Sequence, residues 1–277
     1  MKKSLKLSLL VTVALLAACT TKEQPNPKPD PTPDKPSTPE TPTQQTWSVN
    51  GSVQKGPFTQ GTTITIQALD EALNPTGKNY STKTSDDAGS FAIGSQIESR
   101  YVEIMAVGYY FNEIEGKVSA STLTLRSLSD LSETGKTNVN LLTTLESDRM
   151  RKLVKEGKTV AEARKQAEQE LFAVFHIPNS VGDTGFDKMD ITKGTEADAI
   201  LLAISASLQA GQSVGELSEL ISKIASEVAA SGKVESDIIQ NKIVECAMKV
   251  DAAAVRQNLT KRYQSLGVSG FVIPPFE

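Results

Sequence analysis

Hydrophobic and polar residues alternate along the first half of the chain, from Trp47 to Arg126. In the stretch 62–69, isoleucines and an alanine lie on one side and threonines and a glutamine on the other, which is typical of a half-buried strand. The stretches 101–111 and 117–126 predict further strands, and 74–77 and 86–89 carry turn residues. Six or seven short strands at this spacing predict an antiparallel β-sandwich over residues 47–130.

The pattern changes to helical spacing at Asn138. Glycines interrupt it, and capping-box sequences begin at Thr159 and Ser213, each with a glutamate three residues later. Six amphipathic helices with short connections favour an antiparallel bundle or stacked hairpins over 138–268. The predicted fold class is therefore α+β, with the sandwich first, the all-α bundle second and a C-terminal tail over 269–277. The predicted helices lie within residues 142–157, 160–174, 200–211, 214–232, 239–250 and 255–266.

The N-terminus has the features of a bacterial signal peptide, covering residues 1–18. Three lysines precede an apolar run from Leu7 to Leu16, which is too short to cross a bilayer as a helix. The run ends in Leu16-Ala17-Ala18-Cys19, which resembles the lipobox of bacterial lipoproteins. The resemblance implies that signal peptidase recognises Leu16, Ala17 and Ala18, and that Cys19 is attached to lipid. A buried N-terminal helix with an incidental cysteine is the alternative.

The residues after the lipobox bear on location. Thr20 stands where a retention signal for the inner membrane would place Asp, and the resemblance therefore favours the outer membrane. Thr21-Lys22-Glu23 resembles the short charged tags of some surface-exposed lipoproteins only in part, so exposure at the cell surface and a periplasmic orientation both stay open.

A proline-rich segment follows, and residues 19–46 are predicted to be a disordered tether. Eight of the 13 prolines lie here among Thr, Asp, Lys and Gln, without aliphatic residues that a core would need. Alternating prolines favour extended polyproline II, so the segment reaches on the order of 80 Å. A spacer from the membrane is the simpler interpretation, and a proline-rich ligand for a partner domain is the alternative.

The strand-rich segment resembles a known family. The order "VNGSVQKGPFTQGTTITIQAL", "LNPTGKNY" and "TKTSDDAGSFAI" is similar to carboxypeptidase-regulatory-like (transthyretin-like) sandwich domains of Gram-negative lipoproteins of undefined role. The family's Thr-acidic-x-x-Gly-x-Phe turn is matched with Ser85 inserted. The resemblance implies a β-sandwich that is accessory to another activity and does not supply the function. The matching residues are Thr84, Asp86, Asp87, Gly89 and Phe91.

Composition excludes several classes of function. Lys plus Arg number 29 against 33 Asp plus Glu, and no basic cluster provides the phosphate contacts that nucleic-acid binding needs. One His and two Cys exclude a disulfide scaffold and a site with two imidazoles. Cys246 lies on an apolar helical stripe and is predicted to be a buried neutral thiol. We expect no catalytic residues, no metal and no cofactor.

Three groups of residues can be interpreted in two ways, as structural or as ligand-binding. Asp86 and Asp87 are expected to close a turn, with a calcium site as the alternative. The segment from His176 to Gly194 breaks the helical pattern and is expected to be an irregular loop, with a divalent cation site as the alternative. Its Asp-Thr-Gly triplet occurs in aspartic proteases, but the second copy and the apolar flanks that such a protease needs are missing. Exposed aromatic side chains would contact a ligand, unless the helical half covers them. These groups include the acidic residues Asp183, Asp187 and Asp190, and the tyrosines Tyr101, Tyr109 and Tyr110.

The sequence therefore predicts a non-enzymatic, lipid-anchored envelope or cell-surface protein that presents both modules for binding. Its partners would be the membrane, through the N-terminal lipid, and a protein or glycan. The apolar tail Val272–Glu277 would pair with a strand or a partner. One alternative is a carbohydrate or small-ligand binder of a nutrient-uptake system, with a groove lined by Tyr101, Tyr109 or Tyr110. The other is a glycoside hydrolase, which needs two inward carboxylates about 5–10 Å apart.

Overall fold

The computed structural model describes residues 45–133, 136–178 and 184–277. Within them the chain is a mixed α and β protein, with nine strands that precede six α-helices and a short 3₁₀ helix between α2 and α3. The predicted change from strands to helices near Asn138 is confirmed. The signal peptide, Leu16, Ala17, Ala18, Cys19 and nearly all of the tether lie outside the described residues, as does Asp183.

The larger sheet has the order β3-β2-β5-β8, and all its pairs are antiparallel. In β2, Ile64, Ile66 and Ala68 are buried while the residues between them are exposed or half-buried, which confirms the predicted alternation. The strands are β2 (Thr63–Leu69), β3 (Pro75–Lys83), β5 (Tyr101–Gly108) and β8 (Leu123–Asp130).

A second sheet has the order β4-β1-β9. Strand β1 (Trp47–Gln54) is antiparallel to β4 (Ser90–Ile97) and parallel to the short β9 (Val139–Asn140). A separate hairpin joins β6 (Phe111–Asn112) and β7 (Lys117–Val118). Strand β9 thus brings the start of the helical half beside the first strand.

The turns follow side-chain chemistry. Asp86 Oδ1 accepts hydrogen bonds from the backbone N–H groups of Ala88 and Ser90, and Gly89 has a φ of 82°, so the predicted turn is confirmed. The turn expected at 74–77 is displaced. The Asp70 carboxylate closes the turn earlier, because it accepts a hydrogen bond from the backbone N–H of Asn74. Strand β3 has therefore already begun at Pro75.

All six predicted helices are present. Both predicted capping boxes form: Thr159 with Glu162 in α2, and Ser213 with Glu216 in α4. The left-handed Gly232 ends α4, as its sequence predicts. The bounds are α1 (Leu141–Lys155), α2 (Val160–Val174), 3₁₀ helix η1 (Phe186–Lys188), α3 (Glu196–Gln209), α4 (Val214–Ser231), α5 (Asp237–Ala247) and α6 (Ala252–Ser265).

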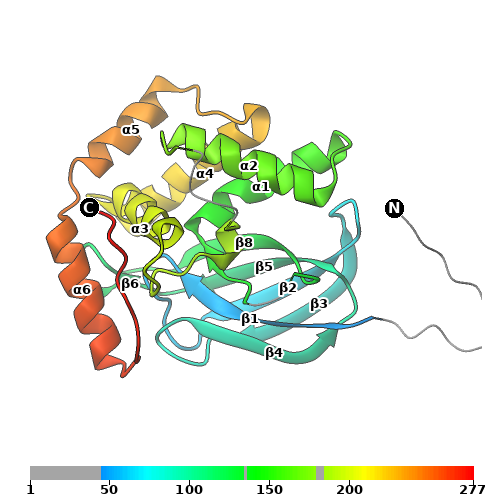
Figure 1. Ribbon diagram of the computed structural model, residues 1–277, viewed down its shortest axis with the longest axis horizontal. Helices are drawn as coiled ribbons and strands as arrows, with labels where there is room; N and C mark the ends of the chain where they lie inside the picture. Colours follow the sequence, from blue (N-terminus) through cyan, green and yellow to red (C-terminus); the bar gives the residue numbers. More distant parts are fainter. Residues whose placement is uncertain (1–44, 134–135, 179–183) are drawn as a thin grey trace, which may run out of the picture. The chain divides into compact units, whose positions relative to one another are not determined.

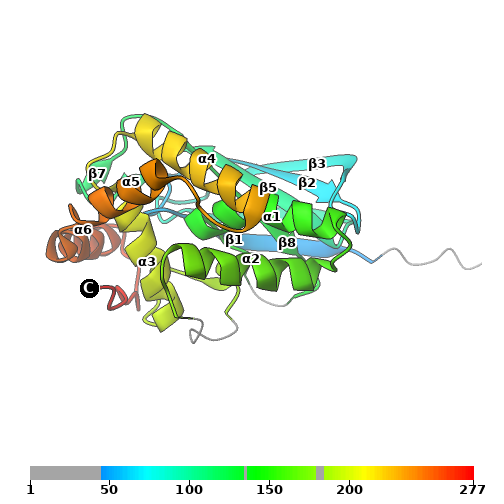
Figure 2. The ribbon, with the colours of Figure 1, turned by 90° about the horizontal axis from the view of Figure 1, so that it is seen from above.

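Strands and helices share one hydrophobic core. One cluster of buried residues includes members of both sheets and of α1 to α6, and the described residues belong to one compact unit. Helix α1 packs on β8, where the Thr143 hydroxyl donates to the Arg126 carbonyl. Helices α1, α2, α4 and α5 lie together above the strands in Figure 1, and Figure 2 looks onto them from that side. Their buried faces are therefore completed by the sheet as well as by one another.

Helix α6 lies apart from the other helices (Figure 1). Its Asn258 donates to the Glu113 carbonyl, and its Arg262 pairs with Asp87 of the β3–β4 turn. Arg256 of the same helix donates to the carbonyls of Ile273 and Pro274 and so holds the tail against its own chain. In the described part of the chain, no helix has the length and apolarity that a membrane span requires.

Candidate functional site

The main concave feature of the described surface is an apolar cleft of about 910 Å³. Four segments form it: the end of α2 with the residues after it, the middle of α3, the residues after α4, and one face of α5. Each segment contributes only a few side chains, and most of these are hydrophobic. They include Val174, Phe175, Ile204, Val234, Ile243 and Val244.

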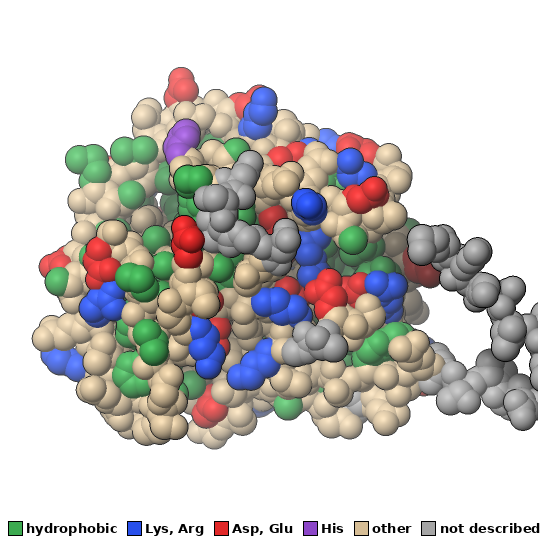
Figure 3. Space-filling model, in the orientation of Figure 1, with side chains coloured by type: hydrophobic (Ala, Val, Ile, Leu, Met, Phe, Trp, Pro, Cys, Tyr) green, Lys and Arg blue, Asp and Glu red, His purple; other side chains and the backbone are tan. Residues whose placement is uncertain are grey.

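Helix α5 forms the outer wall of this cleft and is poorly covered. Val244 is 58% exposed and Met248, just after the helix, is 83% exposed. Figure 3 shows hydrophobic side chains on this part of the surface, near the single histidine. Large apolar residues exposed together mark a binding surface more often than scattered ones do.

Polar groups stand at the edge of the cleft. His176 has a positive φ of 53° and lines the cleft with Lys233 and Glu170. Glu170 is paired with Arg149. Lys233 is exposed and has no ion-pair partner among the described residues. The cleft therefore combines an apolar interior with one cationic group at its rim.

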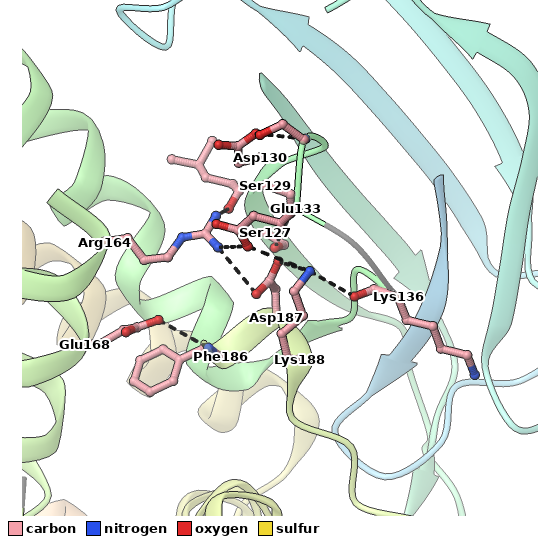
Figure 4. Close-up of polar contacts among 12 residues, drawn as sticks. Ser127, Ser129, Asp130, Glu133, Lys136, Arg164, Glu168, Phe186, Asp187 and Lys188 are labelled. Atoms are coloured by element: carbon pink, nitrogen blue, oxygen red, sulfur yellow. Dashed lines mark hydrogen bonds and ion pairs between the residues drawn. The ribbon is translucent and has the colours of Figure 1, made fainter. Parts of the chain in front are cut away.

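A second feature is a cluster of charges between α2, β8 and η1, drawn in Figure 4. The Arg164 guanidinium donates to the Leu128 carbonyl at 3.0 Å, to Glu133 at 3.3 Å and to Asp187 at 3.4 Å. Lys188 contacts the other oxygen of Asp187 at 3.3 Å. These contacts join three elements that are far apart in sequence.

Two carboxyl groups beside this cluster have raised pKa values, which favour their protonated forms. Burial, together with the charge of Glu168, raises the pKa of Glu146 well above its ordinary value. Burial also raises the pKa of Glu168 to about 7, although the Phe186 N–H donates to its Oε1. Both groups therefore disfavour the folded state when they ionise.

This pKa shift gives a testable pH dependence. The pKa of Glu168 is near 4.5 in the unfolded chain and about 7 in the folded protein. The folded protein therefore becomes less stable as the pH rises from 4.5 to 7, because ionisation is less favourable in the folded state. We expect the wild type to lose about 3 kcal/mol more stability than Glu168→Gln between pH 5 and 8. Urea unfolding at both pH values measures this difference. The exposed Glu219→Gln variant serves as the control, and equal losses in wild type and Glu168→Gln would contradict the expectation.

The structure does not bring the three tyrosines together. Tyr110 is fully buried and donates to Gln209 of α3, so its ring is unavailable to a ligand; this matches the alternative in which the helical half covers it. Tyr101 is partly buried beneath the Arg100 guanidinium, and Tyr109 is 47% exposed. Tyr101 and Tyr109 lie at opposite ends of β5, roughly 25 Å apart along the strand. A shared sugar-binding groove cannot form from them.

The acidic residues considered for metal binding have protein partners. Asp190 accepts from Gln54 and Thr192, and Asp187 is held by Arg164 and Lys188. Among the described residues no group of three His, Cys, Asp or Glu side chains is arranged to hold a metal ion. His176 instead lines the apolar cleft.

Glu168 and Asp187 are two neighbouring carboxylates, and the glycoside hydrolase alternative would need such a pair. A Cβ at Gly185 would lie 3.5 Å from Glu168 Oε1 and 3.1 Å from Asp187 Oδ1, so the two carboxylates are neighbours. Asp187, however, is 1% exposed and forms an ion pair with the Arg164 guanidinium. A sugar ring has no access to it, and the pair is better explained as part of the ion network.

The burial predicted for Cys246 is confirmed. Its thiol is free, and the Gln212 side-chain amide donates to the sulfur at 2.8 Å. Sequence reasoning missed Arg164, Glu146 and Glu168. A signal was present, because Glu146 lies four residues after Leu142 on the buried stripe of α1, where an unpaired charge is unusual.

The chain matches no known protein family, no curated protein and no solved structure. What its cleft and its charged cluster do must therefore follow from their own chemistry.

Proposed function

We propose that this chain is a non-enzymatic lipoprotein of the outer membrane that binds an apolar ligand with an anionic head in the cleft between α2, α3 and α5. The observation that carries the binding proposal is the cleft itself, with its apolar lining and the exposed Val244 and Met248. The lipobox and the proline-rich segment of the sequence support the anchor and the spacer. Presentation at the cell surface is part of the same proposal.

The chemistry of the cleft selects the ligand class. Its volume of about 910 Å³ is within the range of small-molecule sites, which are mostly apolar with a few polar groups that orient the ligand. Lys233 is a cation at the rim without an ion-pair partner in the described chain, so it favours a carboxylate or similar head group. A fatty acid has both features.

The finer architecture also belongs to this proposal. The sequence resemblance supports a carboxypeptidase-regulatory-like sandwich, and the two sheets contribute side chains to one core. Helices α1 to α5 would be the bundle that carries the cleft. In this scheme the sandwich is the accessory module and the helices supply the binding site.

A fluorescent fatty acid tests the proposal. The probe is titrated into the Cys19→Ser chain, so that the protein's own acyl chains cannot compete. We expect saturable binding, and we expect Val244→Asp to weaken it about tenfold or more, because the new carboxylate lies in the apolar wall and repels the head group. Lys233→Gln should weaken binding about threefold to tenfold.

Ile238→Asp is the matched control. Ile238 is on the same helix and is 81% exposed, but it does not line this cleft, so its variant should bind as the wild type does. Because Val244 and Ile238 are exposed, neither change should prevent folding. Absence of saturable binding, or equal binding by Val244→Asp and the wild type, would refute the assignment of the cleft.

A further inference from the structure

A lysine and a glutamate are buried together in the core of the strand-rich half. Lys55 directly follows β1, and Glu113 directly follows β6, 58 residues later in the chain. Lys55 Nζ donates to Glu113 Oε1, and both side chains are fully shielded from solvent. Such complete burial is rare for both residue types and needs a physical explanation.

The surroundings provide few groups that would stabilise two full charges. The second oxygen of Glu113 is buried and has no hydrogen-bond partner among the residues that the structure describes. The Tyr110 ring lies 5.7 Å from Lys55 Nζ and stacks on Phe58. Burial lowers the pKa of Lys55, with the charge of Glu113 opposing this shift only in part. Desolvation therefore favours the neutral amine of Lys55, which is the nucleophilic form of this side chain.

The backbone holds the two side chains close together. A Cβ added at Gly56 would lie 2.1 Å from the Phe111 carbonyl oxygen and 3.0 Å from Glu113 Oε2. Only glycine therefore allows the turn after β1 to approach the segment that carries Glu113 this closely. Reacting groups held in contact behave as if present at a very high local concentration.

We propose that Lys55 and Glu113 form an intramolecular amide bond in the folded protein. The Nζ–Cδ bond forms and one Cδ–Oε bond of the carboxyl group breaks. The lysine nitrogen and the carboxyl group carry three protons between them: two leave with the departing oxygen as water, and one remains as the amide N–H. No oxidation state changes, and no co-reactant is needed.

The proposed reaction suits a dry environment. Water released from a buried site passes to bulk solvent, and its exclusion from the core opposes hydrolysis of the product. The product would link the end of β1 covalently to the β6–β7 hairpin.

Mass spectrometry of the denatured chain tests the proposal directly. The lipid-free Cys19→Ser chain serves as the wild type in this experiment, because acyl chains on Cys19 would change the mass. We expect it to be lighter than its sequence by one water molecule, and a protease digest to contain a branched peptide that joins Lys55 to Glu113. Lys55→Arg lacks the amine that forms the amide, so the mass of this variant should equal its sequence. A wild-type mass equal to the sequence, with the two peptides separate, would overturn the proposal.

Lys117→Arg controls for dehydration elsewhere. Lys117 pairs with Glu115 in the same hairpin, but both side chains are largely exposed. This variant should lose one water as the wild type does. If Lys55→Arg also loses it, the amide is not at this pair. The branched peptide of the wild type decides the matter even if Lys55→Arg does not fold.

Discussion

A Cys19→Ser variant will lose its acyl label and move from the membrane fraction to the soluble fraction. The reason is that each buried CH₂ of an acyl chain contributes about 0.8 kcal/mol, so the two or three chains of a lipoprotein hold it to the bilayer almost irreversibly. Serine has no thiol to form the thioether. Metabolic labelling with palmitate, followed by fractionation of the envelope, measures both effects, and we expect a nearly complete shift.

Cys246→Ser provides the control for this experiment. Cys246 is the second cysteine of the chain, and its thiol is buried beside Gln212. A protein with this change should still be labelled and should still sediment with membranes. Label that depends on Cys246, or a Cys19→Ser protein that is still labelled, would refute the lipobox interpretation and with it the anchored function.

An Arg164→Met variant will be less stable than the wild type by about 3–5 kcal/mol. Methionine preserves much of the volume but leaves the buried Asp187 with Lys188 as its remaining cation, and leaves the Leu128 carbonyl without its donor. Removing one partner of a buried ion pair is costly because the other charge is then buried without compensation. Urea unfolding at pH 7 measures the loss.

Arg126→Met is the matched control, because Arg126 also pairs with a carboxylate, that of Asp148, but at a partly exposed site. Its loss should cost less than about 1 kcal/mol. Adding Asp187→Asn to Arg164→Met should recover part of the stability, since it removes the uncompensated charge. If Arg164→Met and Arg126→Met cost the same, the network does not hold α2, β8 and η1 together.

Much of the secondary structure could be predicted from local sequence patterns. Alternation at Ile64 and Ile66 identified β2, and the capping boxes at Thr159 and Ser213 located two helix starts, because these signals depend on neighbours within a few residues. The burial of Cys246 was predicted correctly from its position on the apolar stripe of its helix. The turn expected at 74–77 was displaced because the Asp70 carboxylate closed the loop earlier.

The contacts between residues that are distant in the sequence could not be predicted in this way. Arg164 reaches Asp187, Tyr110 turns inward to Gln209, and Lys55 meets Glu113, each across 23 or more residues. The cleft is assembled from four segments that carry no common motif. Local periodicity specifies which face of an element is buried, but the partner of that face is selected by the packing of the whole core, to which both sheets and all six helices contribute.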